Sequence, residues 1–427
     1  MLGALALLAG GCGGGVGGAG SGGAAAQIDA LMRPYTGAVP GAAVMVLKDG
    51  VPVFRRAYGR ADLEHGVAAT AASNFRLASM TKEFTAAAIL LLAEDGRLSL
   101  DDPVRRWLPA LPPAAAAVTL RHLLTHTGGL IDYEDLIAAD ATQQVHDADV
   151  LRLLGPEDRT YFAPGTRYRY SNTGYALLSL VVERASGREF AAFLRARIFV
   201  PLGMYATLAY QAGISSVPRR AYGYSASGQA WTRTDQSLTS AVLGDGGIYS
   251  SIDDLAKWDA ALYDARLLKL ESLAAAFAPA TPTDDPEVRY GFGWRITGET
   301  LWHSGETLGF RNVIVRFPRR HFTVIVLTNR DEPEPSPLAL AIASLYLPDA
   351  AGVRAAPGAA GPSAEGRPLP PRCALRAGAA TPARRRARRR TRRYRHPRHP
   401  ASTWWCRDRG PRHPRPAAAR ARARAPP

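Results

Sequence analysis

Two groups of β-rich runs, separated by a long helical stretch, constrain the fold of this chain more than any other feature. In residues 42–54, Lys48-Asp49-Gly50 joins two such runs with a sequence typical of a tight hairpin. In residues 311–328, two alternating runs follow each other. Residues from about 100 to 285 read instead as helical segments interrupted by Pro and Gly. We therefore predict an antiparallel sheet that is assembled from both ends of the chain and flanked by helices.

The globular part is predicted to span residues 26–350. The chain has 427 residues, of which 47% are hydrophobic, and this is enough for a substantial core. Residues of about 26–100 and 285–350 would form a sheet subdomain, and about 101–284 an inserted, mostly helical subdomain. The predicted fold class is therefore α+β.

Residues 351–427 form a segment with a very different composition. They contain 21 Arg, one Glu and one Asp, and almost no large apolar side chains. Because such a segment cannot offset its conformational entropy by burial, we predict a disordered tail. This segment carries a net charge of +19, whereas the whole chain carries +16, so residues 1–350 carry −3. Because the globular part is nearly neutral, the positive net charge of the chain does not indicate nucleic acid as a partner. An arm that binds polyanions or acidic lipid, and an out-of-frame reading of a GC-rich gene, remain as alternatives.

Residues 1–25 read as an export signal followed by a Gly-rich tether. The apolar run is too short for a permanent transmembrane helix. It ends in Ala9-Gly10-Gly11-Cys12, which resembles the cleavage box of bacterial lipoproteins, so we expect a lipid on Cys12 and a location in the periplasm or cell envelope. Ala9 stands where lipoproteins prefer Leu, and no Lys or Arg precedes the run. Ordinary secretion and the absence of export therefore stay open.

Ser79 and Lys82 form the first candidate catalytic pair. Only four of the 53 Lys and Arg residues are Lys, so a Lys is informative in this chain. On the helix predicted from Ser79 to Leu92, a spacing of three residues places both side chains on one face. A Lys can take the proton of a hydroxyl only where its surroundings disfavour the ammonium form, and Arg cannot replace it. Taken alone, the pair is a weak signal.

Tyr170-Ser171-Asn172 is the second candidate element. It follows Pro164-Gly165 and precedes a helical run, which places it in a loop. A phenol can relay a proton when cations surround it, and an Asn side chain can donate to a substrate carbonyl. A packing loop with a turn Asn is the structural alternative.

His303-Ser304-Gly305 is the third element, between Leu301-Trp302 and a strand predicted near Phe310. A Gly there would let a substrate backbone lie against the edge of a strand. His126-Thr127-Gly128 repeats the pattern but precedes the Tyr loop, so we interpret His126 as a residue of local loop structure. The three cysteines, which are Cys12, Cys373 and Cys406, leave no disulfide framework or Cys-rich metal site between them.

In this order, Ser-x-x-Lys, Tyr-x-Asn and His-x-Gly resemble the motifs of the penicillin-recognising serine hydrolases. The similar branch contains class C β-lactamases, D-alanyl-D-alanine carboxypeptidases and related esterases. The resemblance covers about residues 28–348 and includes residues 122–130, 201–204 and 244–251. It implies a β-lactamase/transpeptidase-like fold and an acyl-enzyme mechanism without metal or cofactor.

The resemblance also implies roles for individual residues. Ser79 would be the nucleophile, and Lys82 with Tyr170 would receive its proton. Substrate binding and the oxyanion hole would involve Asn172, His303, Ser304, Gly305 and the backbone N–H groups of Ser79 and Glu306.

His303 stands where β-lactamases of this branch carry Lys. A His that is mostly neutral at pH 7 is a poor partner for a substrate carboxylate, which favours a carboxypeptidase or esterase acting on D-amino-acid peptides or small esters. A class C-like β-lactamase is the alternative among enzymes. A penicillin-binding sensor that is acylated but hardly turns over is the alternative outside enzymes.

Overall fold

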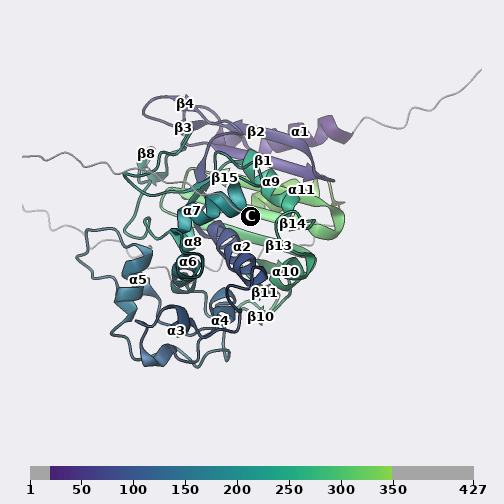
Figure 1. Ribbon diagram of the computed structural model, residues 1–427. Coiled ribbons are helices and arrows are strands. Elements are labelled where there is room, and N and C mark those ends of the chain that lie inside the picture. Colours follow the sequence, from purple (N-terminus) through teal and green to yellow (C-terminus); the bar gives the residue numbers. More distant parts are fainter. Residues whose placement is uncertain (1–19, 349–427) are drawn as a thin grey trace, which may run out of the picture. The chain divides into compact units, whose positions relative to one another are not determined.

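The computed structural model describes residues 20–348, so Cys12, most of the export segment and the tail from residue 351 lie outside it. An eight-stranded antiparallel sheet with the order β10-β11-β12-β13-β14-β15-β1-β2 dominates this part of the chain (Figure 1). Its strands are β1 (Ala42–Lys48), β2 (Val51–Tyr58), β10 (Thr281–Pro282), β11 (Val288–Tyr290), β12 (Arg295–Thr297), β13 (Thr300–Thr307), β14 (Phe310–Phe317) and β15 (Phe322–Thr328). The predicted α+β class, with a sheet built from both ends, is confirmed.

The pairing of β1 with β15 joins the early and late parts of the sheet. The two strands are in register from Ala42 opposite Thr328 to Lys48 opposite Phe322. On its other side β1 pairs with β2 through the predicted hairpin. Asp49 and Gly50 both have positive φ, at 53° and 75°, as the tight turns of two-residue hairpins require.

Both faces of the central strands are covered by helices, because successive side chains point to opposite faces. On one face, Val44 and Val326 pack with Ile28 of α1 (Gly20–Leu31) and Ile342 of α11 (Ser336–Ser344). On the other face, side chains such as Met45 belong to a larger core that includes the helical region. This second face is the one that carries the candidate site.

Helix α2 (Thr81–Glu94) runs through the larger core, and residues 81–92 are all buried. Residues 86–92 of this helix are apolar on all sides, which is typical of a helix in a protein interior. A 3-10 turn, Ala78–Met80, precedes it, so the helix begins two residues later than Ser79, where the sequence predicted it.

The region between the two parts of the sheet is mostly helical, with short strands that the sequence did not indicate. Its helices are α3 (Val104–Trp107), α4 (Leu120–Leu124), α5 (Asp147–Leu154), α6 (Asn172–Ser186), α7 (Phe190–Leu194), α8 (Leu243–Gly246), α9 (Ile252–Ala261) and α10 (Leu270–Ala276). Its strands, with those just before α2, are β3 (Arg60–Asp62), β4 (Val67–Ala68), β5 (Phe75–Arg76), β6 (Leu208–Ala209), β7 (Tyr224–Ser227), β8 (Ala230–Arg233) and β9 (Ile248–Ser250). No helix within residues 20–348 is long and apolar enough to cross a bilayer.

Candidate active site

Ser79 lies on the 3-10 turn immediately before α2 and is partly exposed. The preceding residue, Ala78, has a φ of +49°, a left-handed conformation that residues with a side chain rarely adopt. Strand β13 lies against this turn, because a Cβ added to Gly305 would stand 1.9 Å from the carbonyl oxygen of Leu77. Only Gly fits at this position, and its absence of a side chain brings the edge of β13 next to Ser79.

Lys82 occupies the first turn of α2 and is fully buried. Its Nζ lies 3.0 Å from the Oγ of Ser79, 2.8 Å from the Oδ1 of Asn172 and 3.1 Å from the main-chain oxygen of Asp245. The predicted hydroxyl and amine are therefore direct neighbours. Such contact is the geometry in which a nucleophile can lose its proton to a base.

Tyr170 lies on the loop before α6, beside the same amine. The centre of its ring is 4.9 Å from the Nζ of Lys82 and 5.3 Å from the guanidinium carbon of Arg295. The amine of Lys82 and the guanidinium of Arg295 thus both lie beside the ring of Tyr170, a placement that suits the proton relay predicted for this residue. Asn172 is the first residue of α6, so the loop places both residues at the start of this helix.

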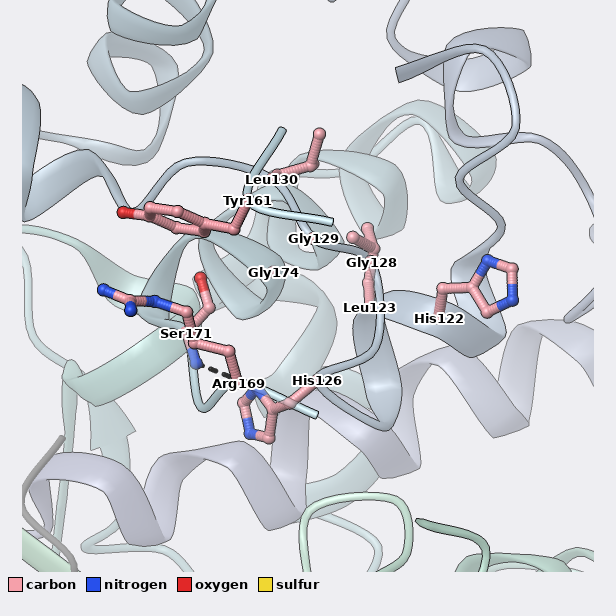
Figure 2. A pocket seen from close by; sticks show the side chains of 10 residues that line it. All are labelled: His122, Leu123, His126, Gly128, Gly129, Leu130, Tyr161, Arg169, Ser171 and Gly174. Carbon is pink, nitrogen blue, oxygen red and sulfur yellow. Dashed lines mark hydrogen bonds between the residues drawn. The ribbon is translucent and has the colours of Figure 1, made fainter. Parts of the chain in front are cut away.

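His126 contacts the loop that carries Tyr170 and Ser171. Its Nδ1 accepts a hydrogen bond of 3.2 Å from the main-chain N–H of Ser171, which Figure 2 shows next to a small pocket. Its ring also lies 4.3 Å from that of Tyr170, centre to centre. Burial, with the nearby charge of Lys82, holds the pKa of His126 well below its ordinary value. These contacts fit the predicted loop role and add a contact with Tyr170 that the sequence did not indicate.

His303 lies inside β13, not ahead of a strand as the sequence suggested, and it is buried. Its Nδ1 lies 2.6 Å from the main-chain oxygen of Ser304, which can only accept, so this nitrogen carries the hydrogen. Its Nε2 then accepts from the hydroxyl of Tyr290 at 3.0 Å. Burial, and then the charges of Arg295 and Lys82, lower the pKa of His303 well below its usual range. The imidazole is therefore neutral and has both nitrogens occupied.

Ser304, Gly305 and Glu306 follow His303 on β13. Ser304 and Gly305 are buried, whereas the Glu306 side chain is partly exposed and lies 4.0 Å from Arg311. The backbone N–H groups of Ser79 and Glu306 remain the predicted oxyanion hole.

Arg295 is a component of the site that the sequence did not reveal. It is 7% exposed, and its guanidinium carbon lies 5.4 Å from the ring of Trp302 as well as close to Tyr170. Within the described residues the guanidinium forms no ion pair, and its Nε has no hydrogen-bond partner. A buried cation without a carboxylate partner is costly in a protein interior, and a bound anion would offset that cost. Among 49 Arg residues, no sequence signal distinguishes this one.

The sequence also did not indicate three acidic side chains around Asn172 and Lys82. Asp132 accepts from the main-chain N–H of Asn172 at 3.0 Å, and Glu134 accepts from its Nδ2 at 2.8 Å. The hydroxyl of Tyr133 donates to Asp245 at 2.9 Å, and burial raises the pKa of Asp245 to about 7. Asp132-Tyr133-Glu134 begins two residues after residues 122–130, which the family resemblance includes, and this proximity is the one sequence signal near the loop.

This geometry serves the activation of a hydroxyl nucleophile. Within residues 20–348, no group of three or more His, Cys, Asp or Glu side chains is arranged to hold a metal ion.

A family model described as Beta-lactamase matches residues 26–347. The chain belongs to this family. It is a serine hydrolase of the β-lactamase and penicillin-binding protein type, which confirms the resemblance inferred from the motifs.

Individual relatives extend this result. Penicillin-binding protein 4* of Bacillus subtilis (strain 168) is 33% identical over 308 residues, which are 68% of each chain. The D-aminopeptidase of Gluconobacter oxydans (strain 621H) is 30% identical over 71% of this chain, which spans 58% of that relative's length. The crystal structure of D-amino acid amidase from Ochrobactrum anthropi SV3 matches with a TM-score of 0.64 and 26% identity, over 77% of this chain and 98% of the amidase.

Proposed function

We propose that this β-lactamase family member hydrolyses small D-amino-acid amides, peptides or esters through an acyl-enzyme on Ser79. The observation that carries the proposal is the 3.0 Å contact between the Oγ of Ser79 and the buried Nζ of Lys82. A serine hydroxyl next to a sequestered amine can attack a carbonyl carbon, whereas an isolated hydroxyl is a weak nucleophile.

The proposed reaction has two halves. In the first, the Oγ of Ser79 bonds to the substrate carbonyl carbon, and its proton passes to Lys82 and through Tyr170 to the amine or alcohol, whose bond to that carbon breaks. In the second, a water oxygen bonds to the acyl carbon, and one of its protons passes through the same groups to the Oγ of Ser79 as the ester bond breaks. This step frees the acid and restores the hydroxyl. The backbone N–H groups of Ser79 and Glu306 would stabilise the oxyanion, a contribution of about 3 to 4 kcal/mol per donor.

The substrate class is supported by charge and by relatives. Because His303 is neutral and fully hydrogen-bonded, Arg295 is the cation that would meet a substrate carboxylate. A D-aminopeptidase and a D-amino acid amidase are both similar to this chain. We therefore favour D-amino-acid derivatives, and keep β-lactam hydrolysis as the second candidate because β-lactams also carry a carboxylate.

A labelling experiment tests the nucleophile. A fluorophosphonate probe should label the wild-type protein, and peptide mapping should place the adduct on Ser79. Ser79→Ala should not be labelled while keeping its melting temperature. Labelling of Ser79→Ala to the wild-type extent would contradict the proposal.

A substrate panel then separates the candidate activities. It comprises a nitrophenyl ester, a D-amino acid amide, a D-Ala-D-Ala peptide and a cephalosporin. Preferred turnover of the amide or peptide supports the proposal, and preferred turnover of the cephalosporin supports a β-lactamase. Stable labelling by fluorescent penicillin without turnover of any substrate would indicate a sensor.

We also propose, from the sequence of residues 1–25, that the protein is exported and anchored through a lipid on Cys12. Its substrates would then be those of the cell envelope. Expression in a bacterial host with a clickable fatty acid should label the wild-type protein and not Cys12→Ala. Equal labelling of both proteins, or of neither, would overturn this proposal.

A further inference from the structure

Asn172 is held at both ends of its side-chain amide. Its Nδ2 donates to the Oε1 of Glu134 at 2.8 Å, and its Oδ1 accepts from Lys82 at 2.8 Å. Its main-chain N–H is bound by Asp132, which precedes Glu134 by two residues on the same loop. The start of α6 is thus fixed while the amide faces Glu134 on one side and Lys82 on the other.

The carboxylate decides which way this amide points. An ionised carboxylate only accepts hydrogen bonds, so it must face the NH2 group of Asn172 and leave the carbonyl oxygen toward Lys82. If the amide turned by 180°, its oxygen would face the Glu134 oxygen and its NH2 group would face the lysine nitrogen. Both contacts would then be lost, so the observed orientation of the amide is strongly preferred.

The orientation of Asn172 in turn decides what Lys82 presents to Ser79. When charged, the Nζ of Lys82 donates to all three of the oxygen atoms that it contacts. In the neutral form that can take the proton of Ser79, it carries two hydrogens and one electron pair. The Oδ1 of Asn172 and the main-chain oxygen of Asp245 are both acceptors, and together they take both hydrogens. The remaining direction, toward the Oγ of Ser79, is then left to the electron pair.

We propose that Glu134 is a positioning residue that fixes the amide of Asn172 so that the electron pair of Lys82 points at Ser79. This inference rests on the proposed acyl-enzyme function. It assigns to Glu134 a role through other residues and not a contact with substrate. A competing role for a carboxylate at this place is the binding of a substrate ammonium group.

Three variants measured on two substrates separate these roles. Glu134→Ala removes the acceptor, Glu134→Gln keeps a carbonyl oxygen that can accept from Asn172, and Glu157→Gln is the control at a partly exposed ion pair with Arg159. The substrates are a nitrophenyl ester without an amino group and a D-amino acid amide. We expect Glu134→Ala to lower kcat about 10- to 100-fold on both substrates, with KM changed less than threefold. Glu134→Gln should recover at least tenfold over Glu134→Ala, and Glu157→Gln should match the wild type.

Two outcomes would overturn the inference. If Glu134→Ala keeps kcat on the ester within twofold of the wild type, Glu134 does not position the base. If Glu134→Gln is as impaired as Glu134→Ala and the loss lies in KM for the amide alone, Glu134 binds a substrate ammonium instead. Melting temperatures and fluorophosphonate labelling of the wild type accompany the kinetics. Labelling at a residue other than Ser79 would contradict the proposed acyl-enzyme function. Labelling at Ser79 together with either kinetic outcome above would contradict only the positioning role of Glu134.

Discussion

Buried polar side chains are usually hydrogen-bonded, and helix α2 carries three such side chains next to one another. Lys82 contacts three oxygen atoms, and Thr85 donates to the main-chain oxygen of Gly244 at 2.7 Å. Glu83 accepts from the indole N–H of Trp258 at 2.8 Å, and burial raises the pKa of Glu83 well above its usual range. The lysine differs from its neighbours in that one of its partners is a partly exposed hydroxyl.

The role of Arg295 can be tested by removing its charge. Arg295→Gln should raise KM for a D-Ala-D-Ala peptide about tenfold or more, because a charge-assisted hydrogen bond contributes about 1.5 to 3 kcal/mol. Turnover of a neutral nitrophenyl ester should change less than threefold and serves as the internal control. Equal losses on both substrates in steady-state kinetics would show that Arg295 supports the site structurally instead.

The buried carboxyl group of Asp245 should make the stability of the fold depend on pH. Burial raises its pKa to about 7 from an ordinary value of 3.8, against the opposing charges of Lys82 and Arg76. The neutral form is therefore favoured in the fold, and the stability it contributes is present below pH 4 and lost as the pH rises through 7. Relative to the wild type, Asp245→Asn should gain stability between pH 4 and pH 8, by on the order of 4 kcal/mol at most. Urea denaturation at pH 4, 6 and 8 measures this, and a difference that does not depend on pH would refute it.

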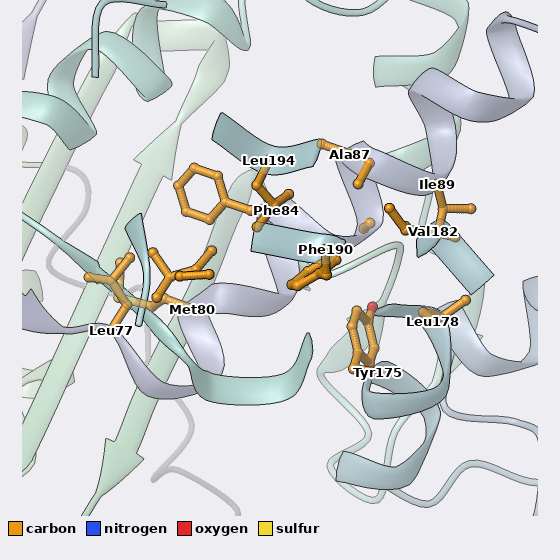
Figure 3. Close-up of a cluster of buried hydrophobic side chains, with 14 of the residues drawn as sticks. Leu77, Met80, Phe84, Ala87, Ile89, Tyr175, Leu178, Val182, Phe190 and Leu194 are labelled. Atoms are coloured by element: carbon orange, nitrogen blue, oxygen red, sulfur yellow. The ribbon is translucent and has the colours of Figure 1, made fainter. Parts of the chain in front are cut away.

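At the scale of elements, α2 owes its place to helices on one side and the sheet on the other. Figure 3 shows Phe84 and Ile89 among side chains of α6 and α7, including Val182 and Phe190. Helix α9 lies against the sheet through a buried ion pair, in which the Nε of Arg316 on β14 is 2.6 Å from the Oδ1 of Asp259. This ion pair connects the helical layer to the sheet.

Breaking the Arg316–Asp259 pair should be strongly destabilising. Asp259→Ala leaves a fully buried guanidinium without its carboxylate, which we expect to cost about 3 to 5 kcal/mol. Asp264→Ala is the matched control, because its pair with Arg266 is about half exposed and should contribute less than about 1 kcal/mol. Chemical denaturation followed by circular dichroism compares the two, and similar losses would contradict the argument.

At the scale of the whole chain, the candidate site joins segments that are far apart in sequence. Ser79 and Lys82 come from the start of α2, Glu134 and Asn172 from the helical region, and His303 from the late part of the sheet. The antiparallel pairing of β1 with β15 holds the two parts of the sheet together. A site of this kind depends on the complete fold of residues 26–347.

The tail should be dispensable for chemistry, because every candidate catalytic or binding residue lies between Ser79 and Glu306. Removing residues 351–427 should leave the labelling rate of Ser79 within twofold of the full chain and the melting temperature unchanged. Retention on an anionic polymer that requires these residues would support the alternative of a binding arm. Loss of labelling in the truncated protein would show that the tail contributes to the site.

Local sequence was enough to find the parts of this protein whose chemistry depends on a few neighbouring residues. The hairpin at Asp49-Gly50 follows from the conformations that Asp and Gly tolerate. The contact of Ser79 with Lys82 follows from their spacing of three residues, although a 3-10 turn and not the helix itself carries Ser79. Order along the chain then linked these motifs to Tyr170 and Asn172. Patterns of hydrophobic residues were sufficient for a sheet made from both ends.

Contacts between distant segments were beyond such reasoning. Arg295 becomes notable because β12 brings it beside Tyr170 and no carboxylate within residues 20–348 pairs with it. Glu134 becomes notable because its loop meets the start of α6. The neutral state of His303 likewise depends on the hydroxyl of Tyr290 from β11 and on burial. Local propensity and spacing act over a few residues, whereas burial, charge and hydrogen-bond direction arise from neighbours that only the folded chain brings together.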